Sequence, residues 1–304
     1  MLANPNGDPN DANKPRIDSE TGLNYVTDVR LKRTIRDEWI ARDKDVLVQD
    51  TWTESGSLSD AKHRGTDFFT EEMKAKYKKA DAKKGLSIED LETFKNNIKK
   101  CIDVRAFGCV LPSEFKNASI TYTGPVQFKM GYSMHPVKLE LVKGTGAFSS
   151  GEGKDQKTFR QEYLLPYSLI NFYGIMNDRS AKETGFTEED CNELLSAMWE
   201  GTKNLISRSK AGQMPRVLLR VVYKKPDYYI GGLDRLISFQ YEGVGEAVRS
   251  IEDGTLVFQK LIERLVEQKE DIDEVLLKLD SQVKTDVDLL EELKINNIKV
   301  TEIS

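Results

Sequence analysis

The spacing of apolar residues predicts two strongly amphipathic helices. In the segment 27–42, Leu31, Ile35 and Trp39 recur every fourth residue, which places their side chains on one helix face. A second helix is expected over 187–206, where the first residue, a threonine, can serve as N-cap and acidic residues fill the first turn. Both helices have the polar outer faces of surface helices that cover a core.

A polar, charged region between these helices has the character of an insertion. It spans 43–100 and contains two further expected helices, over 71–85 and 87–100, separated by a break at Gly85. Ser87 and Asp90 resemble a capping box at the start of the second of these helices. Beyond Gly243, two or three amphipathic helices are expected to alternate with acidic turns up to the C-terminus.

Alternation of apolar and polar residues predicts strands elsewhere. The segment SITYTGPVQFKMGYSM (119–134) is rich in β-branched and aromatic residues, with an expected interruption at Gly124-Pro125. Further strands are expected over 137–142 and 216–224. The apolar run EYLLPYSLINFYGIMN (162–177) fits either a buried strand, bent at its proline, or a buried helix, because periodicity does not separate the two.

Without the insertion, the predicted order is helix, strand, long hairpin, strand, helix, strand. A leading strand would complete βαββαβ, the ferredoxin-like arrangement that RNA-recognition domains use. The expected fold class is therefore α+β.

Composition narrows the class of protein. The 304 residues contain no apolar run close to the roughly 20 residues that span a bilayer, so no membrane partner is expected. The start, MLANPNGDPND, is polar and turn-rich, unlike a signal peptide. Three cysteines then indicate reduced thiols in a cytoplasmic protein, and with only two histidines we expect no metal site and no cofactor.

Charge is segregated along the chain. The net charge is −5, yet the stretch 202–225 holds seven basic residues and no acidic one, whereas 246–304 holds 15 acidic and 8 basic residues. Such segregation is typical of a surface for a polyanion on one side of the molecule and a solvated or partner-facing surface on the other.

The glycine-rich stretch KGTGAFSSGEGKDQK (143–157) resembles a phosphate-binding loop only superficially. A Walker loop needs Ser or Thr after its lysine, but Asp155 follows Lys154, and Ser149 replaces the third glycine of G-x-G-x-x-G. The stretch therefore predicts a hairpin tip that can touch a nucleic-acid backbone through four cations, Lys143, Lys154, Lys157 and Arg160. Similarly, NPNGDPND near the N-terminus lacks the glutamate that closes a calcium loop and predicts turns.

The loop SRSKAGQMPR (207–216) combines cations with neutral donors and contains no acid. This mixture suits phosphate contacts, and it equally suits a solvated basic loop at the end of a helix, where cations favour the dipole. No Ser-His-Asp arrangement or specific set of carboxylates appears, so no catalytic residues are expected.

Several stretches taken together resemble a known family. In order, they are NPNGDP, ETGLNYVTDVRLKRTIRD, DVRAFG, SITYTGPVQF, KGTGAFSSGEGKDQKTFR, EYLLPYSLINFYG, GTKNLISRSKAGQMPR and IGGLDRL. They resemble the CRISPR-associated Cas-seven family, the backbone subunit of type I Cascade, and most closely its subtype I-B members. The resemblance spans 4–236.

The resemblance implies an RNA-recognition-like palm, a helical fingers insertion and a β-hairpin thumb. The palm corresponds to 1–42, 101–133 and 161–236, the fingers to 43–100 and the thumb to 134–160, which leaves 237–304 as an acidic helical segment. Relatives usually begin with a short apolar strand before ANPNGDP, where this sequence has only Met1 and Leu2, so the first palm strand is expected to be missing.

The resemblance also implies an antiviral function without catalysis. Copies of the chain polymerise along a guide RNA (crRNA), together with other Cascade subunits, and leave guide bases free to pair with target DNA. The implied RNA contacts are the thumb cations already named, three helix cations and five loop residues: Lys32, Arg33, Arg36, Arg208, Lys210, Gln213, Met214 and Arg216.

Two other functions stay open from the sequence. Type III relatives of the family cut target RNA with an acidic residue near the thumb loop, which implies a metal-dependent ribonuclease using Asp155 or Glu152. A scaffold that binds only protein is the third possibility.

Overall fold

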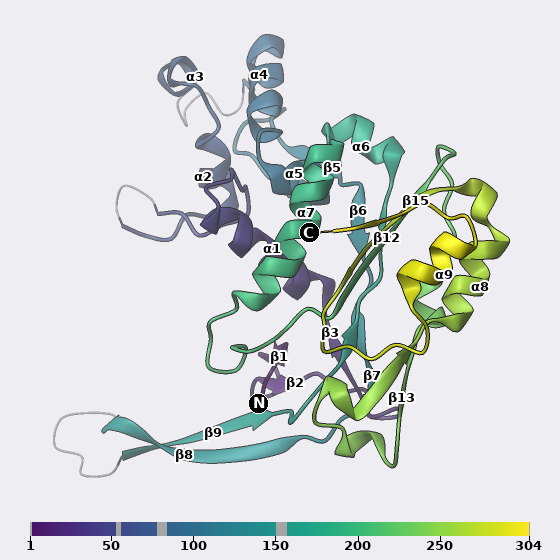
Figure 1. Ribbon diagram of the computed structural model, residues 1–304. Helices are drawn as coiled ribbons and strands as arrows, with labels where there is room; N and C mark the ends of the chain where they lie inside the picture. The colour runs from purple at the N-terminus through teal and green to yellow at the C-terminus, as the bar shows by residue number, and fades with distance from the viewer. Residues whose placement is uncertain (1, 53–55, 78–83, 150–156, 304) are drawn as a thin grey trace. The chain divides into compact units, whose positions relative to one another are not determined.

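The computed structural model describes residues 2–52, 56–77, 84–149 and 157–303 (Figure 1). The chain divides into two compact units. Unit 1 comprises 1–31, 129–173 and 202–304, and unit 2 comprises 32–128 and 174–201. Within the described ranges, no helix is both long enough and apolar enough to cross a bilayer.

The helix predicted over 27–42 is confirmed, whereas the one predicted over 71–85 ends at Lys76 among the described residues. In α1 (Asp28–Ala41), Ile35 and Trp39 are fully buried. The inserted region contains α2 (Ala61–Thr66), α3 (Glu71–Lys76) and α4 (Ile88–Ile98), followed by α5 (Ile102–Phe107). Their apolar faces form a core around Phe94 and Ile98. The predicted cap of α4 is confirmed, because the Ser87 hydroxyl accepts a hydrogen bond of 3.2 Å from the Asp90 amide.

Unit 2 also contains two small antiparallel pairs of strands. One joins β4 (Gly108–Leu111) to β5 (Ile120–Thr123), and the other joins β6 (Val126–Phe128) to β11 (Gly174–Met176). The predicted interruption at Gly124-Pro125 is confirmed. A Cβ on Gly124 would lie 2.0 Å from the backbone of Phe107, so only glycine fits there. Two helices complete the unit, α6 (Asp178–Thr184) and the predicted α7 (Glu188–Lys203).

Unit 1 begins with turns and short strands. The first two, β1 (Gly7–Asp8) and β2 (Lys14–Pro15), pair with each other, and β7 (Gly131–Pro136) lies between β3 (Leu23–Val26) and β10 (Ile170–Asn171). The apolar run 162–177 forms strands and bends at Pro166, so the alternative of a buried helix is wrong. The predicted long hairpin is confirmed as an antiparallel ribbon of β8 (Glu140–Ser149) and β9 (Lys157–Leu164).

The rest of unit 1 is a layered α+β structure. Its sheet has the order β12-β15-β16, in which β12 (Val217–Tyr223) is antiparallel to β15 (Ile272–Leu279) and β16 (Val300–Glu302) is parallel to it. A second pair joins β13 (Ser238–Tyr241) to β14 (Gly254–Val257). Two helices, α8 (Gln259–Glu267) and α9 (Leu289–Ile295), cover one face of the sheet (Figure 1) and bury Leu261, Leu265 and Leu293 against it.

The prediction of a helical segment over 237–304 was therefore incomplete. Its helices are present, but the segment also contains four strands, β13 to β16, that were not expected. In β15, the sequence IDEVLLKL buries Ile272, Val275 and Leu277 in the core while acidic residues face outward. The acidic residues concealed the alternation that is typical of a half-buried strand.

Candidate nucleic-acid interface

The basic loop between α7 and β12 is an ordered series of turns. The Ser207 carbonyl accepts hydrogen bonds from the amides of Lys210, at 3.0 Å, and Ala211, at 2.7 Å. Gly212 then adopts φ of +83°, in the left-handed region that favours glycine. Backbone hydrogen bonds thus hold the first half of the loop in turns.

The N-terminal segment ties this loop to the base of the hairpin. Ala3 exchanges two backbone hydrogen bonds with Leu165, of 2.9 and 2.7 Å, directly after β9. The next amide, of Asn4, donates to the Ser209 carbonyl at 2.8 Å. The N-terminus accordingly lies beside β2 and β9 in Figure 1. The turn-rich sequence of this segment gives no signal of its bracing role.

Arg160 and Arg208, predicted from separate motifs, meet at one carboxylate. The Arg208 Nε lies 3.2 and 3.0 Å from the two carboxylate oxygens of Glu162, and the Arg160 guanidinium donates to the same carboxylate. The hydrogen bond from Arg160, and then that from Arg208, holds the pKa of Glu162 below its usual value despite some desolvation. We refer to these three residues as the Glu162 cluster.

The pairing of β8 with β9 separates the hairpin cations onto two faces. Arg160 lies opposite Gly144 and Glu162 opposite Val142, so both side chains emerge on the face of the Glu162 cluster. Lys143 lies opposite Gln161 and emerges on the other face, on which the Tyr163 ring also lies. Lys157 is the first residue of β9, and Lys154 lies outside the described residues.

Lys210 is a half-buried cation in the same unit. Burial, and then the nearby charge of Arg30 in the first turn of α1, lowers the pKa of Lys210 from its ordinary value. A phosphate bound beside Lys210 would stabilise the charged form of this lysine and so offset both effects on its pKa.

The other loop residues differ in how they are engaged. The Gln213 amide nitrogen is buried without a hydrogen-bond partner among the described residues, and Met214 is 44% exposed. The Arg216 guanidinium instead donates to Asp280 at 2.6 Å and to Gln282 at 2.8 Å. Arg216 thus anchors the end of the loop to the C-terminal part of unit 1.

The three predicted cations of α1 belong to unit 2, and only Arg33 is well exposed. Arg33 pairs with Asp37 at the surface, at 2.7 Å. Lys32 and Arg36 lie over the Phe107 ring, with Lys32 Nζ at 5.6 Å and Arg36 Cζ at 5.2 Å from its centroid.

Arg36 is also part of a buried ion pair. Its Nε donates at 2.8 Å to the carboxylate of Asp103, which is 1% exposed. The same carboxylate accepts the backbone amides of Leu47 and Val48, at 2.7 and 3.1 Å. Arg36 therefore stabilises unit 2 through this buried ion pair.

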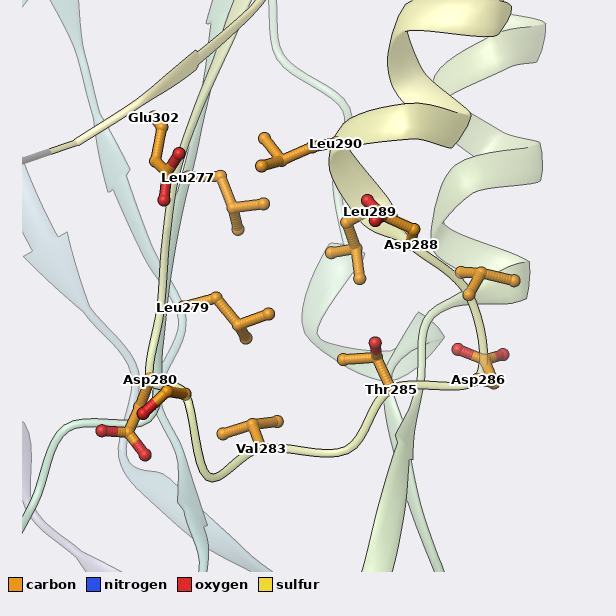
Figure 2. Close-up of a pocket in the computed structure, with 12 residues that line it drawn as sticks. Leu277, Leu279, Asp280, Val283, Thr285, Asp286, Asp288, Leu289, Leu290 and Glu302 are labelled. Atoms are coloured by element: carbon orange, nitrogen blue, oxygen red, sulfur yellow. The ribbon is translucent and has the colours of Figure 1, made fainter.

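A cavity of about 430 Å³ in unit 1 is acidic, in contrast to the basic loop (Figure 2). Its walls combine leucines from β15 and α9 with the carboxylates of Asp280, Asp286, Asp288 and Glu302. Carboxylates repel phosphates, so this cavity is unsuitable for a nucleic-acid backbone.

Potential metal ligands are not gathered among the described residues, and two of the three thiols are protonated. Within the described ranges, no group of three or more His, Cys, Asp or Glu residues could hold a metal ion. Burial raises the pKa of Cys101 to about 12 and that of Cys109 to about 11, so both thiols are protonated at neutral pH. The predicted ribonuclease candidates, Glu152 and Asp155, lie outside the described residues.

Comparisons with known proteins place this mixed α+β chain in a class of CRISPR-associated proteins. Residues 1–259 match the family model described as CRISPR-associated protein Cas7. A CRISPR-associated protein Cas7 from Haloferax volcanii is 30% identical over 303 residues, which cover 93% of this chain and 85% of that protein. The chain therefore belongs to the Cas7 family, as its sequence motifs predicted.

A solved structure supports the same fold. A chain from a "CRISPR RNA-guided surveillance complex, pre-nicking" aligns with a TM-score of 0.59 and 18% identity, covering 100% of this chain and 94% of that one. At this identity the likeness concerns the fold, which is a mixed α+β arrangement. The assignment to subtype I-B stays a prediction.

Proposed function

We propose that this chain is a non-catalytic backbone subunit of a type I Cascade surveillance complex that binds guide RNA. Membership of the Cas7 family supports the class. The observation that carries the proposal is the meeting of Arg160, in β9 of the hairpin, with Arg208, in the loop that also holds Lys210.

In this proposal the hairpin of β8 and β9 is the thumb, and the inserted helices within 43–100 are the fingers. The palm comprises 1–42, 101–133 and 161–236. Several copies line up along one guide RNA with other Cascade subunits, and the guide bases pair with target DNA. Sequence information then resides in base pairing, while the protein holds the RNA backbone.

The chemistry of the Glu162 cluster and its loop suits backbone binding. Guanidinium groups offer paired donors that match the oxygens of a phosphate. Phosphate contacts position a nucleic acid but carry no sequence information. A subunit with such contacts binds any guide sequence, as a CRISPR system with many guides requires.

The test is the paired substitution Arg208→Ala with Lys210→Ala. Affinity for two unrelated single-stranded RNAs of equal length, measured by fluorescence anisotropy, is expected to fall about 10- to 100-fold for both, since the variant lacks two charge-assisted hydrogen-bond donors. The matched control is Lys224→Ala with Lys225→Ala, which removes two charges from the same basic stretch but outside the loop. A weakening confined to one RNA sequence, or equal in the control, contradicts the proposal.

The absence of catalysis is tested separately. The assembled complex, incubated with Mg²⁺ and RNA complementary to its guide, is expected to leave that RNA intact. Cleavage that disappears in Asp155→Ala would replace this proposal with the ribonuclease alternative.

A further inference from the structure

Glu162 occupies an unusual place for an acid in a surface proposed to bind RNA. Its carboxylate is engaged from two directions, by Arg160 two residues earlier in β9 and by Arg208 in the loop. The side chain of Glu162 is 22% exposed, whereas those of Arg160 and Arg208 are 43% and 67% exposed. Solvent therefore reaches the cations more readily than the acid that pairs with them.

A carboxylate and a phosphate compete for the same guanidinium donors. Both present two oxygens that accept the parallel N–H groups of an arginine. An RNA phosphate that reaches Arg160 or Arg208 must displace Glu162 or share the donors with it. Since one anion replaces another, the first such contact contributes little net free energy.

Glu162 is not needed to hold the loop in place. The backbone bonds from Asn4 to Ser209 and from Lys210 to Ser207 already fix the loop. The carboxylate thus acts mainly on the charge available to a ligand, rather than on the position of the main chain.

We propose that Glu162 is a specificity-determining residue that competes with RNA phosphates for Arg160 and Arg208 and so selects long guide RNA over short fragments. This inference rests on the proposed function. A fragment that makes few contacts loses much of its binding to the competition, whereas a long RNA held at many sites displaces the carboxylate through its high effective concentration.

The test compares Glu162→Gln with Glu140→Gln, each measured against a six-nucleotide RNA and an RNA of guide length. Glu140 lies opposite Leu164 on the same ribbon face, so its substitution removes the same charge outside the cluster. Glu162→Gln is expected to tighten binding of the short RNA about three- to tenfold, in line with the removal of two exposed ion pairs. The preference for long RNA should shrink, and Glu140→Gln should change both affinities much less.

A double substitution separates competition from a change in folding. In an Arg208→Ala background, Glu162→Gln is expected to give a smaller gain, because one of the two contested donors is gone. Equal effects of the two glutamine variants, or weaker binding by Glu162→Gln, would overturn the inference while leaving the proposed function intact. Failure of the unsubstituted chain to bind either RNA would instead count against the proposed function.

Discussion

Arg160 lies directly opposite Gly144 across the ribbon of β8 and β9. A Cβ added to Gly144 would meet no heavy atom within 4 Å, and the glycine does not adopt a positive φ. Neither crowding nor backbone conformation therefore requires glycine here. Glycine leaves the backbone beside the exposed Arg160 guanidinium uncovered. Under the proposed function, this would let an RNA backbone approach closely.

Substitutions at Gly144 should weaken RNA binding without harming the fold. Relative to glycine, Ala and Val favour a strand, by about 0.5–1 kcal/mol for Ala. We expect the thermal midpoint to stay level or rise along the series Gly144→Ala and Gly144→Val, while RNA affinity falls progressively with side-chain size. Affinity that is unchanged in Gly144→Val would show that RNA does not pass this strip.

Lys210 is expected to lower the stability of the fold while strengthening RNA binding. Burial lowers the pKa of Lys210, so the charged form of this lysine reduces the free energy of unfolding. This loss is complete below the lowered pKa and disappears as pH rises toward the ordinary pKa of lysine. Lys210→Met should therefore raise the thermal midpoint by roughly 1–2 °C and weaken RNA binding. Scanning calorimetry and anisotropy measure the two effects. A variant that is both less stable and unaltered in RNA affinity would assign Lys210 a structural role instead.

Substitutions of Arg33 and Arg36, three residues apart on α1, should differ strongly in how much they destabilise the fold. Arg36→Met leaves the buried Asp103 carboxylate without its cation, which costs about 3–5 kcal/mol when a buried pair is broken. Arg33→Met breaks only a surface pair with Asp37, worth about 0.2–1 kcal/mol. Urea denaturation should thus show a large drop in stability for Arg36→Met alone. Equal midpoints for the two variants would contradict the structural role of Arg36.

His135 should make unit 1 sensitive to acid. Its Nδ1 faces the carbonyls of Pro136 and Gly245, at 2.8 and 3.1 Å, and its Nε2 accepts the Leu169 amide at 3.3 Å. This tautomer is neutral, and burial lowers the pKa of His135 below its ordinary value of 6.5.

The sign of that pH dependence follows from linkage. Below pH 6.5 the unfolded chain binds a proton that the folded histidine resists, so the free energy of unfolding falls as pH decreases from 6.5 to the lowered pKa of the folded state. Urea midpoints at pH 7.5 and 5.5 should differ more for the unsubstituted chain than for His135→Asn. The same difference in both proteins would assign the acid sensitivity to other groups.

The sequence was most informative where a pattern is local. The periodicity of α1, the cap at Ser87 and the hairpin around the glycine-rich stretch depend on residues close together in the chain, and the structure confirms all three. The strand β15 was missed because its acidic residues resemble the composition of turns.

The sequence does not show which acidic residues pair with the basic residues. Arg36 pairs with Asp103, 67 residues away, and Arg216 with Asp280, 64 residues away. Arg208 meets Glu162 across 46 residues. Charge counting identifies candidate RNA contacts but cannot show which cations are already committed to ion pairs, since folding alone brings such partners together. The assignment of each cation to RNA therefore stays a prediction.

The salt dependence of RNA binding tests the central claim most directly. Affinity for a guide-length single-stranded RNA is measured at several salt concentrations, for the unsubstituted chain and for Arg208→Ala with Lys210→Ala. We expect a steep linear fall of log affinity with log salt, the same for unrelated sequences, and a slope reduced by about 0.7 for each phosphate that the variant no longer neutralises. Binding that is insensitive to salt, or a slope unchanged by the double substitution, would contradict a backbone subunit that holds guide RNA through these residues.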